Sequence, residues 1–296
     1  MIHRTMRDFL SALEKKGLLR RIARPVDRMW EPAALARWMY QALPAEKRFG
    51  MFFEKVKGSD IPIVTAVLGA NTAAYAAALG VEPDGINDAW VRACRNPVPP
   101  KVVDKAPCQE VVITGKEVRL SCLPIPVWTP GKDKGAYITT NTVTRDYNTG
   151  IQNMGVYRTM VRDETSLISN LRPGRQGYLN TLTWTDKGKV APIAWVIAAP
   201  PAVHLATVAN MPYGADEIDI AGGMTGAPIE IRGNAVTRPG GGAYEAIEMY
   251  GTRGAFRAVA NTVTGPGYPT FGRVGLRQAL THASLIASGS MPRAVA

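Results

Sequence analysis

The segment from Tyr137 to Met160 constrains the fold of this chain more than any other. Residues 137–144 are almost all β-branched or aromatic, and residues 151–161 alternate in the way that a strand with two distinct faces requires. Between them lie residues 146–150, Asp-Tyr-Asn-Thr-Gly, which tolerate tight and left-handed backbone. The segment therefore predicts two antiparallel strands joined by a tight turn.

The second strand of this hairpin carries an unusual set of residues. Since successive side chains of a strand point to opposite faces, we expect Asn153, Gly155 and Tyr157 on one face. Arg158 then lies on the other face or at the strand end. A glycine within a strand lowers stability and often marks the close approach of a ligand or of other backbone. The local pattern alone also fits an ordinary hairpin of the core.

The charge of the chain permits anionic ligands but does not indicate nucleic-acid specificity. Its 296 residues carry a formal net charge of +11, which favours binding of anions such as a phosphate-bearing cofactor. The basic residues are spread out, with Lys15-Lys16 and Arg20-Arg21 as local pairs, and no stretch interleaves them with stacking aromatic residues. We therefore expect a basic surface with a site for an anionic ligand, and no specific nucleic-acid partner.

Neither a membrane span nor a secretory signal is expected. No apolar run approaches the ~20 residues that cross a bilayer, and the first residues contain no apolar signal segment. The three cysteines, Cys94, Cys108 and Cys122, are odd in number, far apart and without a CxxC pair. That usage is typical of reduced thiols rather than of a disulfide framework or a zinc site. These features predict a cytoplasmic protein.

The chain divides into three predicted parts. Residues 1–100 form an α/β lobe followed by a linker, because the proline-rich run at 96–100 excludes regular structure. Residues 101–232 are richer in strands, and residues 233–296 form a Gly- and Arg-rich tail without a clear period. Strands mixed with short helices predict an α+β fold with a half-open barrel rather than a doubly wound sheet.

The expected elements follow the hydrophobic periodicity of each part. Helices are predicted over residues 5–20, 31–43, 72–79, 88–95, 178–185, 201–209 and 216–224, with a further one over 279–287. Besides the hairpin, strands are predicted over residues 51–56, 61–67, 110–114, 166–169, 191–198 and 229–231.

The chain contains side chains with oxygen donors and positive charge, but no familiar catalytic motif. GxSxG, HExxH and a GxGxxG that follows a strand are absent, and the histidines His3, His204 and His282 are far apart, so we expect each to be structural or solvent-facing. Asn153 supplies a neutral amide oxygen that suits Mg²⁺ or Mn²⁺. Arg158 supplies a bidentate fork for a carboxylate. The alternative is an asparagine in a bulge and an arginine on a solvated face.

Several stretches in a fixed order resemble the UbiD-type carboxy-lyases. They are Asp8-Phe-Leu with Leu13-Glu-Lys-Lys-Gly, Phe52-Phe-Glu-Lys-Val-Lys-Gly, Leu123-Pro-Ile-Pro, Tyr137-Ile-Thr-Thr, Thr149-Gly-Ile-Gln-Asn-Met-Gly-Val-Tyr-Arg, Met211-Pro-Tyr-Gly and Asp219-Ile-Ala-Gly-Gly-Met-Thr-Gly-Ala-Pro. The resemblance covers roughly residues 6–231, about three quarters of the chain. The Asn-x-Gly-x-Tyr-Arg element, together with Met-Pro-Tyr-Gly, is its most specific part.

This resemblance implies a fold, a reaction and a set of cofactors. The fold is an N-terminal α/β lobe, a flavin-reductase-like split-barrel domain and a C-terminal dimerising domain that is largely missing here. The reaction is reversible, non-oxidative decarboxylation of an aromatic or α,β-unsaturated acid. The cofactors are prenylated FMN, supplied by a flavin prenyltransferase, with Mn²⁺ or Mg²⁺ and K⁺. The implied assembly is a homo-oligomer or a hetero-oligomeric carboxylase.

The resemblance also assigns candidate site residues. Asn153 and Gln176 correspond to metal ligands, and Asn153 also to a ligand of the cofactor phosphate. Arg158 corresponds to the catalytic arginine that engages the substrate carboxylate. The residues whose positions imply contact with the cofactor are Thr140, Asn153, Met154, Gly155, Val156, Tyr157, Arg158, Gln176, Met211 and Pro212.

Three departures from the family pattern bear on activity. Gln176 stands where many relatives have a metal-binding histidine, and Ala227 stands where a metal-binding glutamate is expected. The run Arg253-Gly-Ala-Phe-Arg-Ala258 lacks the family's two catalytic glutamates. We therefore expect an under-coordinated metal and no evident proton donor. Three explanations stay open: a truncated or misread product, an accessory subunit completed by a partner, and a divergent relative without the reaction.

Overall fold

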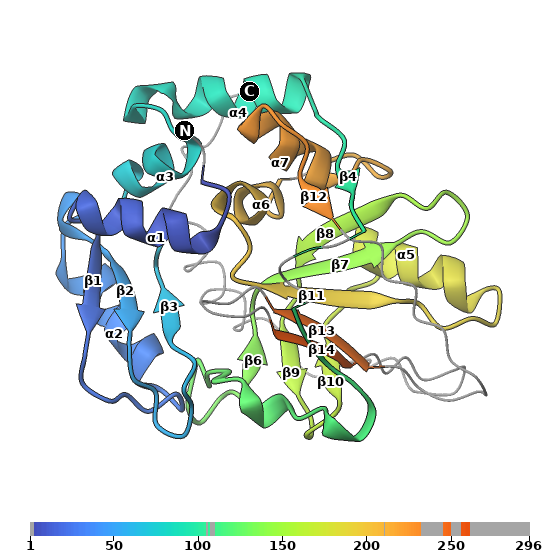
Figure 1. Ribbon diagram of the computed structural model, residues 1–296, viewed down its shortest axis with the longest axis horizontal. Helices are drawn as coiled ribbons and strands as arrows, with labels where there is room; N and C mark the ends of the chain where they lie inside the picture. Colours follow the sequence, from blue (N-terminus) through green and yellow to red (C-terminus); the bar gives the residue numbers. More distant parts are fainter. Residues whose placement is uncertain are drawn as a thin grey trace.

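The computed structural model describes residues 3–104, 106, 110–209, 211–231, 245–249 and 256–260 of the 296-residue chain. The N-terminal elements form a small sheet with helices on one side of the molecule, and the larger sheets stand on the other side (Figure 1). This mixture of helices and separate sheets confirms the predicted α+β class. Among the described helices, none is long and apolar enough to cross a membrane.

The first part of the chain is a three-stranded sheet covered by helices. Its strands are β1 (Leu19–Ile22), β2 (Gly50–Phe53) and β3 (Ile63–Thr65), with β1 parallel and β3 antiparallel to β2. Its helices are α1 (Met6–Lys15), α2 (Glu31–Ala42), α3 (Thr72–Leu79) and α4 (Ile86–Arg95). The helices predicted over residues 31–43, 72–79 and 88–95 are therefore confirmed to within about two residues at each end.

The helix predicted over residues 5–20 is too long. It ends at Lys15, and Gly17 then adopts a φ of 69°, a left-handed conformation that glycine takes without steric cost. The chain reverses there, so that Leu19 already belongs to β1. The apolar spacing continued past the helix end because the strand buries Leu19 in the same core cluster as α1.

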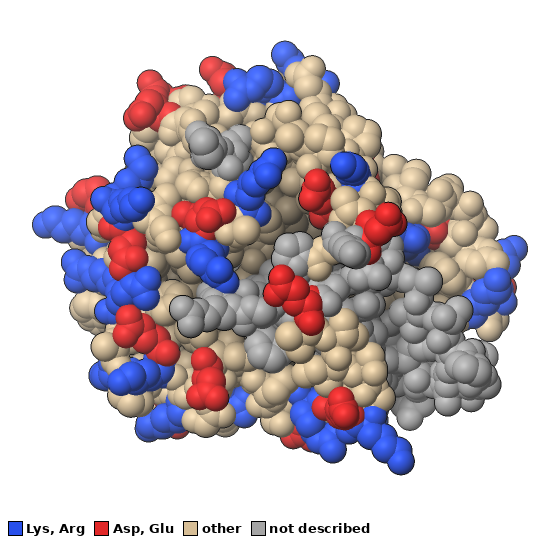
Figure 2. Space-filling view, viewed as in Figure 1, with Lys and Arg blue, Asp and Glu red and all other residues tan. Residues whose placement is uncertain are grey.

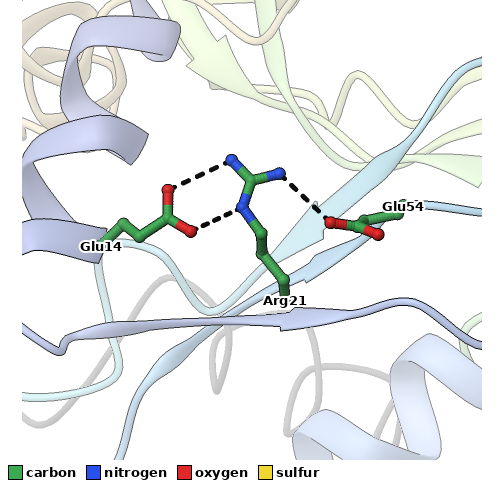
Figure 3. A network of polar contacts seen from close by, with 3 residues as sticks. All are labelled: Glu14, Arg21 and Glu54. Atoms are coloured by element: carbon green, nitrogen blue, oxygen red, sulfur yellow. Dashed lines mark hydrogen bonds and ion pairs between the residues drawn. The ribbon is translucent and has the colours of Figure 1, made fainter.

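Arg21 of β1 joins α1 to the segment after β2 (Figure 3). Its guanidinium lies 2.6 Å from a Glu14 carboxylate oxygen and 3.4 Å from one of Glu54, and its terminal carbon lies 4.7 Å from the centre of the Phe52 ring. Both ion pairs are largely exposed to solvent, so their contribution to stability is small.

The remaining described strands form three further sheets. Their orders are β5-β14-β13-β11-β7-β8, β10-β9-β6 and β12-β4. The strands are β4 (Lys101–Val102), β5 (Val111–Ile113), β6 (Tyr137–Ile138), β7 (Asn141–Arg145), β8 (Gln152–Val156), β9 (Thr159–Val161), β10 (Leu167–Ser169), β11 (Ile193–Ile197), β12 (Glu230–Ile231), β13 (Glu245–Met249) and β14 (Phe256–Ala260). The helices of this part are α5 (Gln176–Thr185), α6 (Pro201–Ala206) and α7 (Glu217–Thr225). Within the described ranges these sheets do not close into a barrel.

The predicted hairpin is present, but each of its strands is divided between two sheets. β7 and β8 pair antiparallel, and Asp146 holds the turn by accepting from the amides of Asn148 and Thr149 at 2.8 Å. β6 and β9 pair in the smaller sheet. The break between β8 and β9 leaves Tyr157 and Arg158 outside both ladders, at the corner where the chain passes from one sheet to the other.

Two strands lie within the segment that was expected to be an irregular tail. β13 pairs parallel with β11, and β14 joins β13 to β5, so both complete the six-stranded sheet. Their sequences, Glu-Ala-Ile-Glu-Met and Phe-Arg-Ala-Val-Ala, are too short to give a clear period. The helix predicted over residues 279–287, together with Cys108 and His282, lies outside the described residues.

Close packing fixes helix α7 against the proline-rich linker. A Cβ at Gly222 would lie 2.2 Å from the Val98 carbonyl oxygen, and one at Gly223 would lie 2.6 Å from that of Ala93. The Val98 amide also donates to the Asp219 carbonyl at 2.9 Å. The glycines therefore let α7 lie directly on α4 and the linker, which positions the first residue of α7.

Charged side chains are interspersed on the face shown in Figure 2. Lys and Arg side chains alternate with Asp and Glu side chains there, without a continuous basic stripe. On this face the basic side chains are spread out, as the sequence predicted.

Candidate functional site

Three polar side chains from three elements meet beside the start of β8. Asn153 of β8 donates through Nδ2 to Gln176 Oε1 at 2.8 Å and to Glu217 Oε1 at 3.0 Å. Gln176 is the first residue of α5, and Glu217 is the first residue of α7. The other Glu217 oxygen accepts from the Met154 amide at 2.7 Å. We call Asn153, Gln176 and Glu217 the polar cluster.

Glu217 is buried, with 2 % of its surface exposed. Burial raises the pKa of its carboxyl to about 7, and the nearby Asp216 acts in the same direction, while hydrogen bonds from Met154 and Asn153 act against them. Burial thus disfavours the ionised form of this carboxyl. A cation beside it would favour the ionised form.

A tyrosine ring explains the glycine in the middle of β8. Tyr157 lies over Gly155 and Gly177, where an added Cβ would come within 2.8 Å of the ring or its hydroxyl. The hydroxyl donates to Asn153 Oδ1 at 3.2 Å and accepts from the Gly177 amide at 3.0 Å. The close approach predicted at Gly155 is therefore made by a side chain of the same segment, which shares the face of Asn153 as expected.

Gln176 connects the polar cluster to the loop before α7. Its Nε2 donates to the Pro212 carbonyl at 2.7 Å and lies 3.4 Å from that of Met211. Tyr213, the next residue, donates through its hydroxyl to Asp146 at 3.3 Å. The structure thus brings the carbonyls of Met211 and Pro212 to the polar cluster.

A small cavity of about 60 Å³ adjoins the polar cluster. It is lined by Asp146, Thr149, Ile151, Gln152, Asn153, Gln176, Asn180, Tyr213, Gly214 and Ala215. Pockets for drug-sized ligands measure roughly 300–1,000 Å³. The cavity is therefore too small for a whole flavin.

The polar cluster fits a hard divalent cation. It contains two side-chain amides and one carboxylate, whose oxygens are the donors that Mg²⁺ and Mn²⁺ prefer. Asn153 here turns Nδ2 to Gln176 and Glu217 and Oδ1 to the Tyr157 hydroxyl, so a cation would require the Asn153 amide to rotate. The described residues contain no group of three or more His, Cys, Asp or Glu side chains that could hold a metal, so such a site depends on the amides. The carboxylate beside Asn153 is that of Glu217, which the sequence analysis did not single out.

Arg158 is fixed by groups that sequence reasoning did not identify. Its Nη2 lies 2.7 Å from Asp133 Oδ1, and its guanidinium carbon lies 4.1 Å from the centre of the Tyr137 ring. Its Nε is buried without a partner. Arg158 is therefore ion-paired and partly buried rather than on a solvated face, and the donors of its fork that Asp133 does not use stay available.

The other candidate cofactor contacts differ in whether their side chains or their backbone groups are available. The Thr140 hydroxyl donates to the Val196 carbonyl at 2.7 Å, and the Met154 side chain is buried in the core. Met154 and Gly155 therefore offer backbone rather than side-chain groups. Val156 is partly exposed at the end of β8.

The described histidines agree with the structural interpretation. His3 contacts the Ala77 carbonyl at 3.0 Å. His204 of α6 is partly buried, and loss of hydration lowers its pKa to about 4, which keeps it neutral.

Comparison with known proteins relates this arrangement to one family. Residues 10–94 match the 3-octaprenyl-4-hydroxybenzoate carboxy-lyase N-terminal domain, and residues 101–236 match the Rift-related domain of the same carboxy-lyase. The chain belongs to the UbiD family.

Solved UbiD-class structures share the fold of this member. An evolved dimeric form of HmfF from Pelotomaculum thermopropionicum, in complex with prFMN, is 32% identical, with a TM-score of 0.71, and the match covers 79% of this chain and 54% of that one. Vanillic acid decarboxylase (ShVdcCD) from Sedimentibacter hydroxybenzoicus, in its closed form, is 26% identical, with a TM-score of 0.72 over 80% and 52%. The chain thus spans about half the length of these relatives.

Proposed function

We propose that this chain forms the cofactor-binding part of a reversible, non-oxidative carboxy-lyase that uses prenylated FMN and acts on an aromatic or α,β-unsaturated acid. The observation that carries the proposal is the polar cluster. Asn153 of this cluster lies on the same short segment as Arg158, which follows five residues later, beyond Tyr157. An oxygen-rich cation site and a carboxylate fork so close together suit an anionic cofactor and an acid substrate.

In this proposal the polar cluster holds Mn²⁺ or Mg²⁺ with the cofactor phosphate. Asn153, Gln176 and Glu217 supply the oxygen donors, and K⁺ would accompany the phosphate. The ring would contact Thr140 and the backbone from Met154 to Tyr157 on one side, and Met211 and Pro212 on the other. When bound, the flavin supplies the electron sink for decarboxylation.

Arg158 would orient the substrate carboxylate. An arginine stays charged at every physiological pH, so it holds the carboxylate and does not donate a proton. Asp133 keeps the guanidinium in place from one side, and Tyr137 covers its face. Asp133 is ion-paired and almost buried, so its role is that of a counter-charge rather than of an acid.

The test is release of CO₂ by the chain after co-expression with a flavin prenyltransferase. Wild-type protein is expected to release CO₂ from at least one acid of an aromatic and acrylic panel. Arg158→Ala should lose this release by about a hundredfold or more while it retains the flavin, because the charged fork is removed and the polar cluster stays intact. Arg162→Ala, which changes an exposed arginine, is the matched control. Equal turnover by Arg158→Ala and wild type would refute the role of Arg158.

A second candidate is an accessory subunit that keeps the fold without completing the reaction. The run Arg253-Gly-Ala-Phe-Arg-Ala258, which lacks the two glutamates that the resemblance implies, favours it. In this case the purified chain remains colourless and associates with a longer homologue. Either proposal includes the three predicted parts of the chain, residues 1–100, 101–232 and 233–296. Either also includes assembly into homo- or hetero-oligomers.

A further inference from the structure

Gln176 makes hydrogen bonds from both ends of its side-chain amide, and each end reaches a different element. The oxygen accepts from Asn153 Nδ2 at 2.8 Å. The nitrogen donates to the Pro212 carbonyl at 2.7 Å, with the Met211 carbonyl 3.4 Å away. A glutamine placed only as a metal ligand requires the oxygen contact alone.

The backbone carbonyls determine the orientation of this amide. A carbonyl oxygen only accepts hydrogen bonds, so the Gln176 nitrogen must face Pro212 and Met211. The oxygen is then directed at Asn153 and the polar cluster. The hydrogen bond between Gln176 and the loop therefore also directs the Gln176 oxygen toward the candidate cation site.

The loop itself continues into the polar cluster. The Ala215 amide donates to the Pro212 carbonyl at 3.1 Å, and Asp216 caps α7 by accepting from the Ile218 amide at 2.9 Å. Glu217 follows directly. Pro212 thus lies four residues before Asp216 and five before Glu217, which is the carboxylate of the cluster.

We infer that Gln176 is a positioning residue that couples the polar cluster to the loop of residues 211–214. Its amide nitrogen fixes the loop, and its amide oxygen completes the cluster. The part of this inference that concerns a cation rests on the proposed function. The part that concerns the loop does not.

Two substitutions separate the two ends of the side chain. Gln176→Glu keeps the shape and adds charge for a cation, but it has no N–H for the Pro212 carbonyl. Gln176→Leu removes both ends. Amide exchange with deuterium, followed by mass spectrometry on the full chain, reports on residues 211–217, and titration with Mn²⁺ alone reports on the cluster.

The expected results differ between the two measurements. Both variants should exchange residues 211–217 about fivefold to tenfold faster than wild type, as loss of one hydrogen bond predicts. Gln176→Glu should bind Mn²⁺ roughly tenfold more tightly, because an ionised ligand replaces a neutral one, whereas Gln176→Leu should bind it more weakly. Opposite changes in affinity with the same change in exchange would support the inference.

Asn180→Asp provides the matched control. Asn180 lies one turn further along α5, is buried and lines the same cavity, but its nitrogen donates to Thr144. This variant should lower overall stability without selective exchange at residues 211–217. Unchanged loop exchange in both Gln176 variants would overturn the inference. Faster loop exchange with no Mn²⁺ binding by any form would support the loop role and refute the cation site of the proposed function.

Discussion

Glu217 occupies a position in which its charge is unfavourable without a cation. The side chain is almost fully buried, and the hydrogen bonds from Met154 and Asn153 do not offset the loss of hydration, so its pKa rises to about 7. Asp216 next to it adds repulsion. A group held in this way is typical of a site that binds a positive ligand.

The first prediction concerns the pH dependence of stability. Because the folded pKa of Glu217 lies above its ordinary value of 4.5, the folded chain binds more protons than the unfolded chain between these values. The free energy of unfolding of the metal-free chain should therefore fall as pH rises from about 4.5 to about 7, by about 3 kcal/mol from this group.

Urea unfolding of wild type and Glu217→Gln at pH 5 and pH 8 measures this contribution. The difference between the two pH values should shrink in Glu217→Gln. Glu164→Gln, an exposed carboxylate whose pKa is lowered by its hydrogen bonds to Ser121, should leave it largely in place. The same pH dependence in wild type and Glu217→Gln would contradict the assignment.

Individual site residues differ in how far the sequence could predict them. Asn153 and Gln176 were predicted together from the resemblance, and the structure places them in contact. Glu217 was missed because an acidic residue in the first turn of a helix already has a local explanation in the helix dipole. Asp133 was missed because no pattern links it to Arg158, 25 residues away.

At the scale of elements, the corner between β8 and β9 depends on small residues around one ring. Gly155 and Gly177 leave the space that the Tyr157 ring occupies, and its hydroxyl then reaches Asn153. The sequence predicted both strands, but the division of each strand between two sheets depends on tertiary packing, which the periodicity within a segment does not contain.

Gly155→Ala should destabilise the chain and displace the Tyr157 ring. The added Cβ would lie 2.8 Å from the ring, so the free energy of unfolding should fall by about 1–3 kcal/mol. Gly135→Ala, whose Cβ would meet its nearest atom at 3.5 Å, is the control and should cost less. Urea unfolding checks both, and equal stability of the two variants would contradict the packing described for Tyr157.

Helix α7 gives a second prediction at this scale. Gly222→Ala would place a Cβ 2.2 Å from the Val98 carbonyl oxygen, which belongs to backbone and cannot rotate away. We expect a loss of about 3 kcal/mol or more, together with weaker Mn²⁺ binding as Glu217 shifts.

The control for this effect is Gly226→Ala. Its φ of 67° is unfavourable for alanine, but no atom lies within 4 Å of the added Cβ. It should cost about 1 kcal/mol through backbone conformation alone. A cost for Gly222→Ala no larger than that for Gly226→Ala would show that α7 does not pack closely on the linker.

At the scale of the whole molecule, segments far apart in sequence complete the same sheet. β13 and β14 insert between β11 and β5, although their short sequences gave no signal. The α+β class and the order of most elements followed from periodicity and turn residues. The partners of β13 and β14 could not be predicted, because strand pairing over long separations depends on the whole fold.

The central claim is that the polar cluster binds a flavin cofactor through its phosphate and a cation. Its most direct test is the amount of flavin per chain after co-expression with a flavin prenyltransferase, measured by visible absorption of the purified protein. The account predicts bound flavin in wild type and its loss in Asn153→Ala, whose overall fold is retained. A colourless wild-type protein, or equal flavin content in the two, would contradict it.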